Sequence, residues 1–207
     1  MTLCLAGPMA AGKNSVAQLL ERRGFASLDA DVVAHEAVEH CKGQILATFD
    51  TLARQRGIAL LDTSGMINRR ALAQLVFADP ALLALHEGIV FPYIDSVLQA
   101  FIKGNAGKDV ALNATVLYKV PAMGKVDCVL FVDAPVWCRL LRAKKRDGSP
   151  VASLLRRFAS QRQLLAKYKS TGVPVVRIRN TGSLASLDRK VDEALTKIRF
   201  LIPTQNS

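Results

Sequence analysis

The chain has 207 residues, half of them hydrophobic, and a formal net charge of +11. This length suits one α/β core with room for an inserted subdomain. The apolar stretches are shorter than the roughly 18 residues that a membrane-spanning helix needs, and no signal-peptide pattern precedes the first apolar run. We therefore expect a cytoplasmic protein that does not enter a membrane.

Residues 3–6 form a short apolar run, and the loop that follows carries a phosphate-binding motif. Gly7, Gly12 and Lys13 match the Walker A pattern G-x-x-x-x-G-K-[ST], whose backbone N–H groups and following helix N-terminus hold anionic phosphates. The lysine of this motif reaches the β and γ phosphates, and the next hydroxyl binds Mg²⁺. Asn14 replaces that hydroxyl, with Ser15 one place later. The motif therefore predicts phosphate binding and leaves Asn14 or Ser15 as the Mg²⁺ ligand.

A helix and a second strand follow the loop, as the motif requires. Apolar side chains recur at helical spacing over residues 16–23, Gly24 ends the helix, and residues 25–28 are a second apolar run. This order of strand, loop, helix and strand favours a true phosphate loop over a chance glycine-lysine turn.

Asp29 and Asp31 come at the end of the second strand. Ligands of open α/β sheets bind outside the carboxyl ends of the strands, so a carboxylate here can lie across the cleft from the phosphate loop. Phosphoryl transfer needs a base within hydrogen-bond reach of the acceptor hydroxyl, and an aspartate fills that role in kinases. We expect Asp31 to be this base; the alternative is that it only caps the next helix.

A long helical segment, residues 31–107, separates the second strand from the third. Asp79 and Pro80 predict the start of a helix, which Pro92 should bend or break. Residues 62–65 predict a turn, and residues 69–77 a short helix. We interpret the segment as an insertion rather than a separate domain.

Three further apolar runs, at residues 110–113, 129–132 and 173–178, complete a set of five. They are near-continuous rather than alternating, which is typical of strands buried on both faces. With helices between them, they predict a parallel, doubly wound sheet. Asp133 ends the fourth run as a Walker B acid would, but Ala134-Pro135 follows, so we favour a helix cap.

Residues 139–169 hold most of the net charge, with ten Lys and Arg residues and one acid, Asp147. Such a block can be a solvated face, a nucleic-acid footprint or the cationic cover of a polyphosphate site, and after a phosphate loop the third interpretation leads. Two helical stretches joined by Gly148 and Pro150 suit a mobile lid. Arg142 and Arg146 share one helix face, either to stabilise a transferring phosphoryl group or as part of a solvated basic face.

The remaining sequence features predict no metal centre. The four cysteines lack C-x-x-C spacing, so we expect reduced, mostly buried thiols. The three histidines show no metal-site pattern, and a structural zinc is not expected. The tail from Pro203 should be loose.

Taken together, these motifs resemble the dephospho-coenzyme A kinase family, within the nucleoside-monophosphate-kinase-like P-loop group. The pieces that match beyond the phosphate loop span nearly the whole chain: residues 24–25, 28–31, 33–36, 65–72, 76–80, 129–133 and 142–147, Gln161, and residues 180–182. The Asp-Ala-Asp with His-Glu, the Phe-Ala-Asp-Pro and the Arg-Asp of the lid are specific in combination.

The resemblance implies a three-layer P-loop kinase core with a five-stranded parallel sheet, at residues 1–30, 108–138 and 170–207 of a single domain. It makes residues 31–107 a helical acceptor-binding insertion and residues 139–169 a helical lid. The implied reaction is ATP-dependent phosphorylation of the ribose 3′-hydroxyl of dephospho-coenzyme A. Its products are coenzyme A and ADP, in the last step of coenzyme A biosynthesis.

The resemblance also implies roles for individual residues. Asp31 falls on the family's proposed base and acts in catalysis with Lys13 and Arg142. The implied acceptor-binding residues are Asp31, His35 and Arg69. The implied ATP-binding residues are Gly7, Ala10, Ala11, Gly12, Lys13, Asn14, Ser15, Arg142, Arg146, Asn180 and Gly182. ATP, accompanied by Mg²⁺, and dephospho-coenzyme A are the expected partners of a monomer or small homo-oligomer that binds neither membrane nor nucleic acid.

This sequence departs from the family pattern at three places. Asn14 stands where the family has its Mg²⁺-binding serine, and Phe91-Pro92 replaces a His-Pro pair. Residues 113–125 lack the usual proline-leucine-leucine and acid, with Lys119 near the place of the acid. The alternatives are therefore a nucleoside or nucleotide kinase, or a P-loop nucleotide-binding protein whose catalysis Asn14 weakens. RNA binding through residues 139–169 is a third alternative, although no RNA-recognition aromatic motif accompanies them.

Overall fold

The computed structural model describes residues 1–148 and 150–202, and the chain divides into two compact units. The first, here called the sheet unit, comprises Met1–Asp29 and Phe101–Ser207. The second, the helical unit, comprises Ala30–Ala100. The expected loose tail from Pro203 lies outside the described residues.

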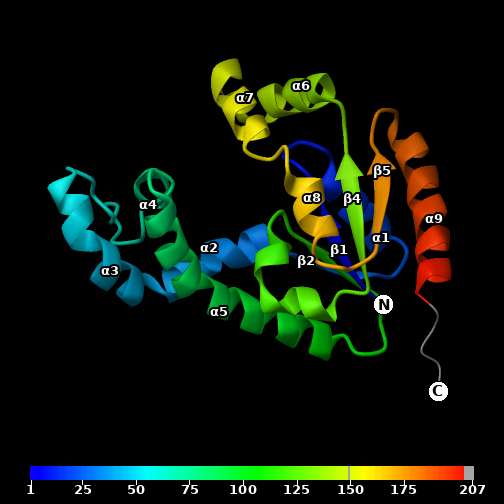
Figure 1. Ribbon diagram of the computed structural model, residues 1–207, viewed down its shortest axis with the longest axis horizontal. Helices are drawn as coiled ribbons and strands as arrows, with labels where there is room; N and C mark the ends of the chain where they lie inside the picture. Colours follow the sequence, from blue (N-terminus) through cyan, green and yellow to red (C-terminus); the bar gives the residue numbers. More distant parts are fainter. Residues whose placement is uncertain (149, 203–207) are drawn as a thin grey trace. The chain divides into compact units, whose positions relative to one another are not determined.

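The sheet unit contains a five-stranded parallel sheet in the order β2-β3-β1-β4-β5 (Figure 1). Each strand lies within two residues of its predicted range. The three central strands are buried as expected, whereas the two edge strands are only partly buried because each has a neighbour on one side only. The strands are β1 (Thr2–Ala6), β2 (Ala26–Asp29), β3 (Val110–Asn113), β4 (Cys128–Asp133) and β5 (Val175–Arg179). The predicted α/β fold with a parallel sheet is confirmed.

Helices cover both faces of this sheet. Leu130 and Val132 face the cluster formed with α1 (Lys13–Glu21) and α9 (Leu184–Leu201). Arg23, just after α1, pairs with Asp188 and Asp192 of α9. On the other face, the ring of Phe131 lies 6.3 Å from that of Tyr168 in α8 (Leu164–Lys169). The sheet thus forms the middle of three layers.

Tyr168 also holds the segment that follows β3. Its buried hydroxyl accepts a hydrogen bond from the backbone N–H of Leu117 at 3.1 Å and donates to the carbonyl of Ala114 at 3.3 Å. This segment contains two short 3₁₀ helices, η1 (Leu117–Lys119) and η2 (Pro121–Lys125). A packed tyrosine therefore positions the segment that lacks the family's proline-leucine-leucine motif.

The basic segment after β4 forms three helices, not the predicted two. They are α6 (Val136–Asp147), α7 (Val151–Ala159) and α8. The additional break, at residues 160–163, brings Gln161 against the phosphate loop, where its side-chain oxygen accepts from the N–H of Met9 at 2.8 Å. No glycine or proline marks this break, so the local sequence does not reveal it.

The helical unit contains α2 (Ala30–His40), α3 (Lys42–Gln55), α4 (Arg69–Val76) and most of α5 (Pro80–Gly104). Asp79 accepts from the N–H of Ala81 at 2.8 Å, so the predicted start of α5 is confirmed. The helix continues through Pro92, and the prediction of a break is wrong. Buried side chains on either side of the proline offset the hydrogen bond that it cannot donate.

Candidate active site

The phosphate loop between β1 and α1 depends on glycines where the backbone is crowded. A Cβ on Gly7, which has φ +148°, would lie 2.1 Å from the carbonyl oxygen of Val132. A Cβ on Gly12, which has φ +102°, would lie 2.2 Å from Asn180 Nδ2. Both contacts are far below van der Waals distance, and positive φ adds strain for any other residue. Tertiary packing, in addition to phosphate binding, therefore accounts for the two glycines of the motif.

Two of the predicted ATP-binding side chains meet at the end of this loop. Asn180, 6% exposed, donates from Nδ2 to the carbonyl of Ala11 at 2.9 Å. Arg142 donates to the same carbonyl at 3.2 Å and to the carbonyl of Asn180 at 3.3 Å. Residues far apart in the sequence thus hold one peptide group of the loop. Arg146 lies one turn further along α6 and is exposed, and Gly182 comes two residues after Asn180.

The side chain of Lys13 reaches back to the other end of the loop, at Gly7. Its Nζ donates to the carbonyl of Gly7 at 3.0 Å, so the ammonium group lies over the first residue of the motif. The lysine of this motif reaches the β and γ phosphates. The terminal phosphate of a bound nucleotide is therefore expected towards the start of the loop.

Asn14 belongs to a polar group that sequence reasoning missed. Asn113, the last residue of β3, donates from Nδ2 to Asn14 Oδ1 at 3.1 Å and to Asp29 Oδ2 at 3.3 Å. Asn113 is buried, and its own Oδ1 has no hydrogen-bond partner. Asp29 and Asn113 are neighbours in the strand register. The sequence does contain a signal for this group: Asp29 and Asn113 are polar residues that each end an apolar run predicted to be a strand.

The oxygens of this group are compatible with magnesium. Among the residues that the structure describes, no group of three or more His, Cys, Asp and Glu side chains is arranged to hold a metal ion. Magnesium at a nucleotide site needs only one or two protein oxygens, because phosphates and water supply the rest. Asn14 and Asp29 offer such oxygens beside the phosphate loop, and Ser15 lies half-buried next to Asn14.

Asp133 does not cap the helix after β4, contrary to expectation. One oxygen of its carboxylate accepts from the N–H of Ala134 at 2.8 Å, and the other pairs with Arg177 of β5 at 2.9 Å. The N-cap position of α6 is Pro135, which has no side-chain acceptor. The parallel neighbour β5 supplies a cation that the local sequence could not show.

In the helical unit, His35 and Arg69 line one cavity of about 930 Å³ together with Glu36, Glu39 and residues of the 62–70 segment. Two contacts shape it: Glu39 accepts from the N–H of Ile67 at 2.8 Å, and Asn68 caps α4. The predicted turn at residues 62–65 is confirmed by the carboxylate of Asp62, which accepts from the N–H of Ser64. Two predicted acceptor-binding residues are thus brought together.

Asp31 lies in the first turn of α2, one turn before His35, and its side chain is exposed. Because α2 begins at Ala30, Asp31 is inside the helix and does not occupy the N-cap position. A carboxylate in a first turn still interacts favourably with the helix dipole.

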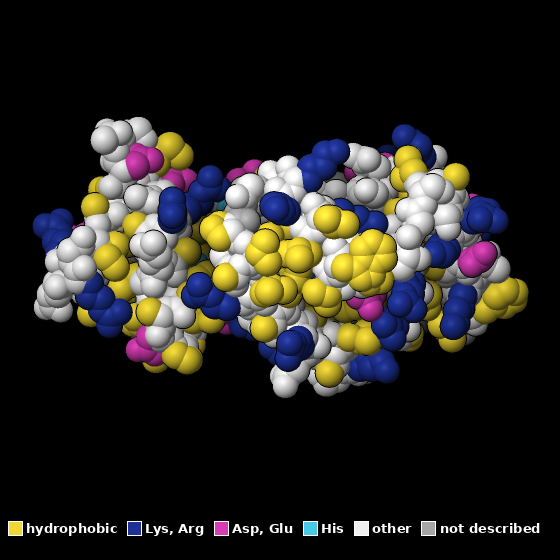
Figure 2. Space-filling model, turned by 90° about the horizontal axis from the view of Figure 1, so that it is seen from above, with side chains coloured by type: hydrophobic (Ala, Val, Ile, Leu, Met, Phe, Trp, Pro, Cys, Tyr) yellow, Lys and Arg dark blue, Asp and Glu magenta, His cyan; other side chains and the backbone are white. Residues whose placement is uncertain are grey.

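The basic segment does not present a continuous cationic face. Figure 2, which looks down on α6 and α7, shows apolar side chains gathered in the middle of the face with Lys and Arg around them. The exposed large apolar residues of these helices are Val136, Trp137, Leu141, Val151 and Leu155. The four cysteines are free and buried, in agreement with the sequence-based expectation.

The chain is similar to known proteins over most of its length. The family model described as Dephospho-CoA kinase matches residues 1–185. The dephospho-CoA kinase of Treponema denticola is 34% identical over 200 residues, which cover 95% of this chain and 89% of the relative. That of Deinococcus radiodurans is 32% identical over 201 residues, covering 96% and 92%. The crystal structure of TT1252 from Thermus thermophilus has a TM-score of 0.78 and 29% identity, covering 95% and 97% of the two chains.

One expectation about membrane insertion needs correction. Helix α5 is long and apolar enough to cross a membrane, with a mean hydropathy of 1.4 over its best window, of which 17% is buried. The sequence-based statement that no stretch reaches this length is therefore wrong. The helix lies wholly inside the region that the family model matches, and helices of soluble proteins pass the same test.

Proposed function

Because this chain belongs to the dephospho-CoA kinase family, we propose that its sheet unit binds ATP at the phosphate loop and that its helical unit binds dephospho-CoA. The chain is a phosphotransferase of coenzyme A biosynthesis, and its family is ATP-dependent.

The observation that supports the donor assignment most strongly is the carbonyl of Ala11. Asn180 and Arg142, both named as ATP-binding from the sequence, donate to this one atom. These contacts set the shape of the loop before any nucleotide arrives, and a preorganised loop needs little rearrangement to bind phosphates. The ammonium group of Lys13, which lies at the start of the loop, then supplies the cation for the β and γ phosphates.

For the acceptor, we propose that the cavity at His35 and Arg69 holds dephospho-CoA. Arg69 presents a guanidinium, which pairs well with the phosphate oxygens of this substrate. Residues 31–107 then form the acceptor-binding insertion and residues 139–169 the lid. The whole enzyme works in the cytoplasm as a monomer or small homo-oligomer.

The proposed reaction assigns the proton to Asp31. As the 3′-hydroxyl oxygen of the acceptor bonds to the γ-phosphorus, its proton passes to the Asp31 carboxylate, and the bond to the β–γ bridging oxygen breaks. ADP leaves with that oxygen. Lys13 offsets the negative charge that the transferring group and the leaving oxygen carry. Arg142 contributes to catalysis by fixing the shape of the loop at Ala11.

Magnesium, when bound with ATP, neutralises phosphate charge and helps to orient the terminal phosphate. We propose that Asn14 Oδ1 holds it, or Ser15 if the hydroxyl one place later is used. Asn113 fixes the side chain of Asn14 and also contacts Asp29, so the three residues place oxygens beside the loop. An amide oxygen is a neutral ligand that can replace the usual hydroxyl.

The test is a kinase assay of the purified chain with ATP, Mg²⁺ and a panel of acceptors that includes dephospho-CoA, nucleosides and nucleoside monophosphates. ADP formation should require dephospho-CoA, and Asp31→Asn should lower kcat by about 10²–10⁴-fold while ATP still binds. Asp50→Asn, on α3 of the same unit, is the matched control and should keep its activity. If a nucleoside supports turnover and dephospho-CoA gives none above the Asp31→Asn level, the proposal is wrong.

A further inference from the structure

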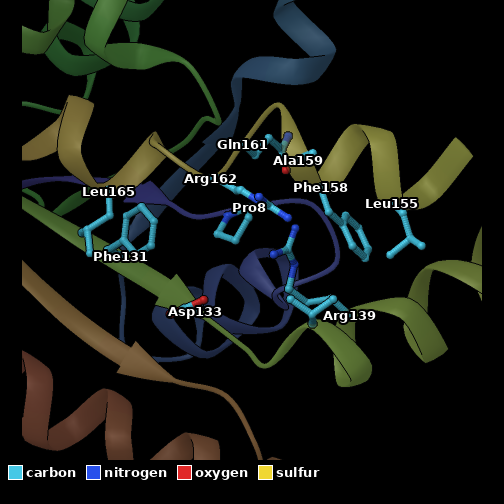
Figure 3. A pocket seen from close by; sticks show the side chains of 11 residues that line it. Pro8, Phe131, Asp133, Arg139, Leu155, Phe158, Ala159, Gln161, Arg162 and Leu165 are labelled. Atoms are coloured by element: carbon cyan, nitrogen blue, oxygen red, sulfur yellow. The ribbon is translucent and has the colours of Figure 1, made fainter. Parts of the chain in front are cut away.

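A second cavity lies beside the start of the phosphate loop, within the sheet unit. It has a volume of about 380 Å³ and is lined by Arg139 of α6, by Gln161 and Arg162 of the turn between α7 and α8, and by Pro8 of the loop. Its remaining walls are mostly apolar, with Phe131, Phe158 and Leu165 among them (Figure 3). None of the ATP-binding or acceptor-binding residues predicted from the sequence lines it.

Arg139 is a buried cation whose hydrogen bonds are incomplete. It is 7% exposed, donates from Nε to the carbonyl of Met9 at 2.9 Å, and stacks at 4.1 Å over the ring of Phe158. Its Nη2 is buried and has no hydrogen-bond partner. Burial lowers the pKa of the guanidinium, which nevertheless remains charged at neutral pH. A buried cation that forms no salt bridge is unfavourable, so this group is suited to receive an anion.

The acid in the same cavity acts on Arg139 only at a distance: the charge of Asp133 raises the pKa of the guanidinium but does not offset the effect of burial. Among the described residues, Arg139 forms no salt bridge, and Asp133 is paired with Arg177 of β5. Arg162, which is exposed, points towards Arg139 over Pro8 (Figure 3). Two guanidinium groups that converge without a carboxylate between them repel each other, and an anion between them would remove that repulsion.

The position of these arginines relates the cavity to the phosphate loop. Arg139 holds the carbonyl of Met9 while Gln161 accepts from its N–H, so this residue is held on both sides. Lys13 lies over Gly7, at the same end of the loop, whereas Arg142 holds Ala11 at the other end. The cavity of Arg139 and Arg162 therefore adjoins the half of the loop where the terminal phosphate is expected.

We propose that Arg139 and Arg162 form a phosphate-binding subsite at the start of the phosphate loop, additional to the backbone cradle of the loop itself. The ligand is a phosphate group, either the terminal phosphate of the nucleotide donor or a separate phosphate. Arg139 receives one phosphate oxygen on Nη2 and Arg162 a second, and the apolar walls exclude water from the contact with Arg139. The subsite does not depend on which acceptor the enzyme uses.

The test is calorimetric binding to the full chain, with adenylyl imidodiphosphate (AMP-PNP), ADP and inorganic phosphate as probes. Arg139→Gln keeps a donor for Met9 but removes the charge, and Arg162→Gln removes the exposed charge. Lys145→Gln, an exposed residue of the same helix, is the control with an equal change in net charge. A charge-assisted hydrogen bond corresponds to about a tenfold change in affinity.

Both arginine variants are expected to bind one probe about tenfold more weakly than the control does. A loss for AMP-PNP with unchanged ADP identifies the donor's terminal phosphate, and a loss for inorganic phosphate identifies a separate one. Equal binding of all probes by the variants and the control would overturn the subsite. So would an equal loss for ADP and AMP-PNP with a lowered melting temperature, because that pattern indicates a structural role. If Arg139→Gln does not fold, Arg162→Gln alone decides.

The outcome is independent of the acceptor assay. A protein that phosphorylated a nucleoside instead of dephospho-CoA would still bind phosphate at this subsite. Conversely, a dephospho-CoA kinase whose arginine variants bind every probe normally would retain its function without the subsite.

Discussion

In the sheet unit, the side chains that bond to the backbone of the phosphate loop are buried or half-buried, whereas in the helical unit Asp31, His35 and Arg69 are exposed on helices. Asn180 and Arg139 each hold a carbonyl of the loop. A phosphate loop works through its backbone N–H groups, so its shape must be held by other parts of the fold. The acceptor residues act through their own side chains and need only a stable helix beneath them. Substitutions in the sheet unit should therefore change the shape of the loop and its affinity for nucleotide, whereas those in the helical unit should change only the reaction with the acceptor.

Among the substitutions that test this difference between the units, Gly12→Ala should have the largest effect, on nucleotide binding. The new Cβ would lie 2.2 Å from Asn180 Nδ2 at a φ of +102°, so either the loop or the Asn180 side chain that holds it must shift. Strain of about 2 kcal/mol corresponds to roughly 30-fold weaker binding of AMP-PNP, measured by calorimetry. Gly88→Ala, in α5, where nothing lies within 4 Å of the new Cβ, should bind normally. Normal binding by Gly12→Ala would show that the loop is not held by this packing.

A smaller effect, confined to the acceptor, is expected in the helical unit. Arg69→Gln and His35→Gln should each raise the KM for dephospho-CoA, by about tenfold for the arginine, while the KM for ATP stays unchanged. Their melting temperatures should equal that of the wild type, because both side chains are exposed. Arg54→Gln on α3 is a control of the same charge change. A loss of stability or of ATP affinity would break the contrast between the units.

Asn14→Ser tests the residue that joins the loop to β2 and β3. The variant restores the hydroxyl of the motif but removes the oxygen that accepts from Asn113. We expect AMP-PNP binding to require several-fold less Mg²⁺, because a hydroxyl is the usual ligand at this position. Gln18→Ser, an exposed residue of α1, controls for the substitution itself. An unchanged Mg²⁺ requirement would show that Ser15 or water already supplies the ligand.

The smallest expected effect is on how the free energy of unfolding depends on pH, through His86 of the helical unit. Burial lowers the pKa of His86, and its Nδ1 has no hydrogen-bond partner. The unfolded chain therefore binds a proton at higher pH than the folded one, so this contribution to stability is present above about pH 6.5 and is lost as the pH falls below it. Urea unfolding at pH 7.5 and 5.0 should show a smaller difference for His86→Asn than for the wild type. An identical difference would exclude His86 as the cause.

The sequence predicted the parts of the fold that depend on local patterns. The phosphate loop, the five strands, the turn at residues 62–65 and the cap at Asp79 each follow from neighbouring residues, and the structure contains them all. The features that the sequence did not predict depend on contacts between residues far apart in the chain. The Met9–Gln161 contact joins residues 152 positions apart, and no local signal indicates it. Asp133 was assigned to a cap because its partner, Arg177, belongs to another strand.

The sequence by itself determined that the chain binds phosphates, because the loop motif places backbone N–H groups and a lysine in a fixed order that needs only neighbouring residues. It also determined the family, through motifs spread along the chain. Only the tertiary structure decided what holds that loop: Asn180 and Arg142 at Ala11, Arg139 and Gln161 at Met9, and Asn113 at Asn14. These contacts arise where separate strands and helices end at the same edge of the sheet, and the order of strands in space is set by packing of the whole core.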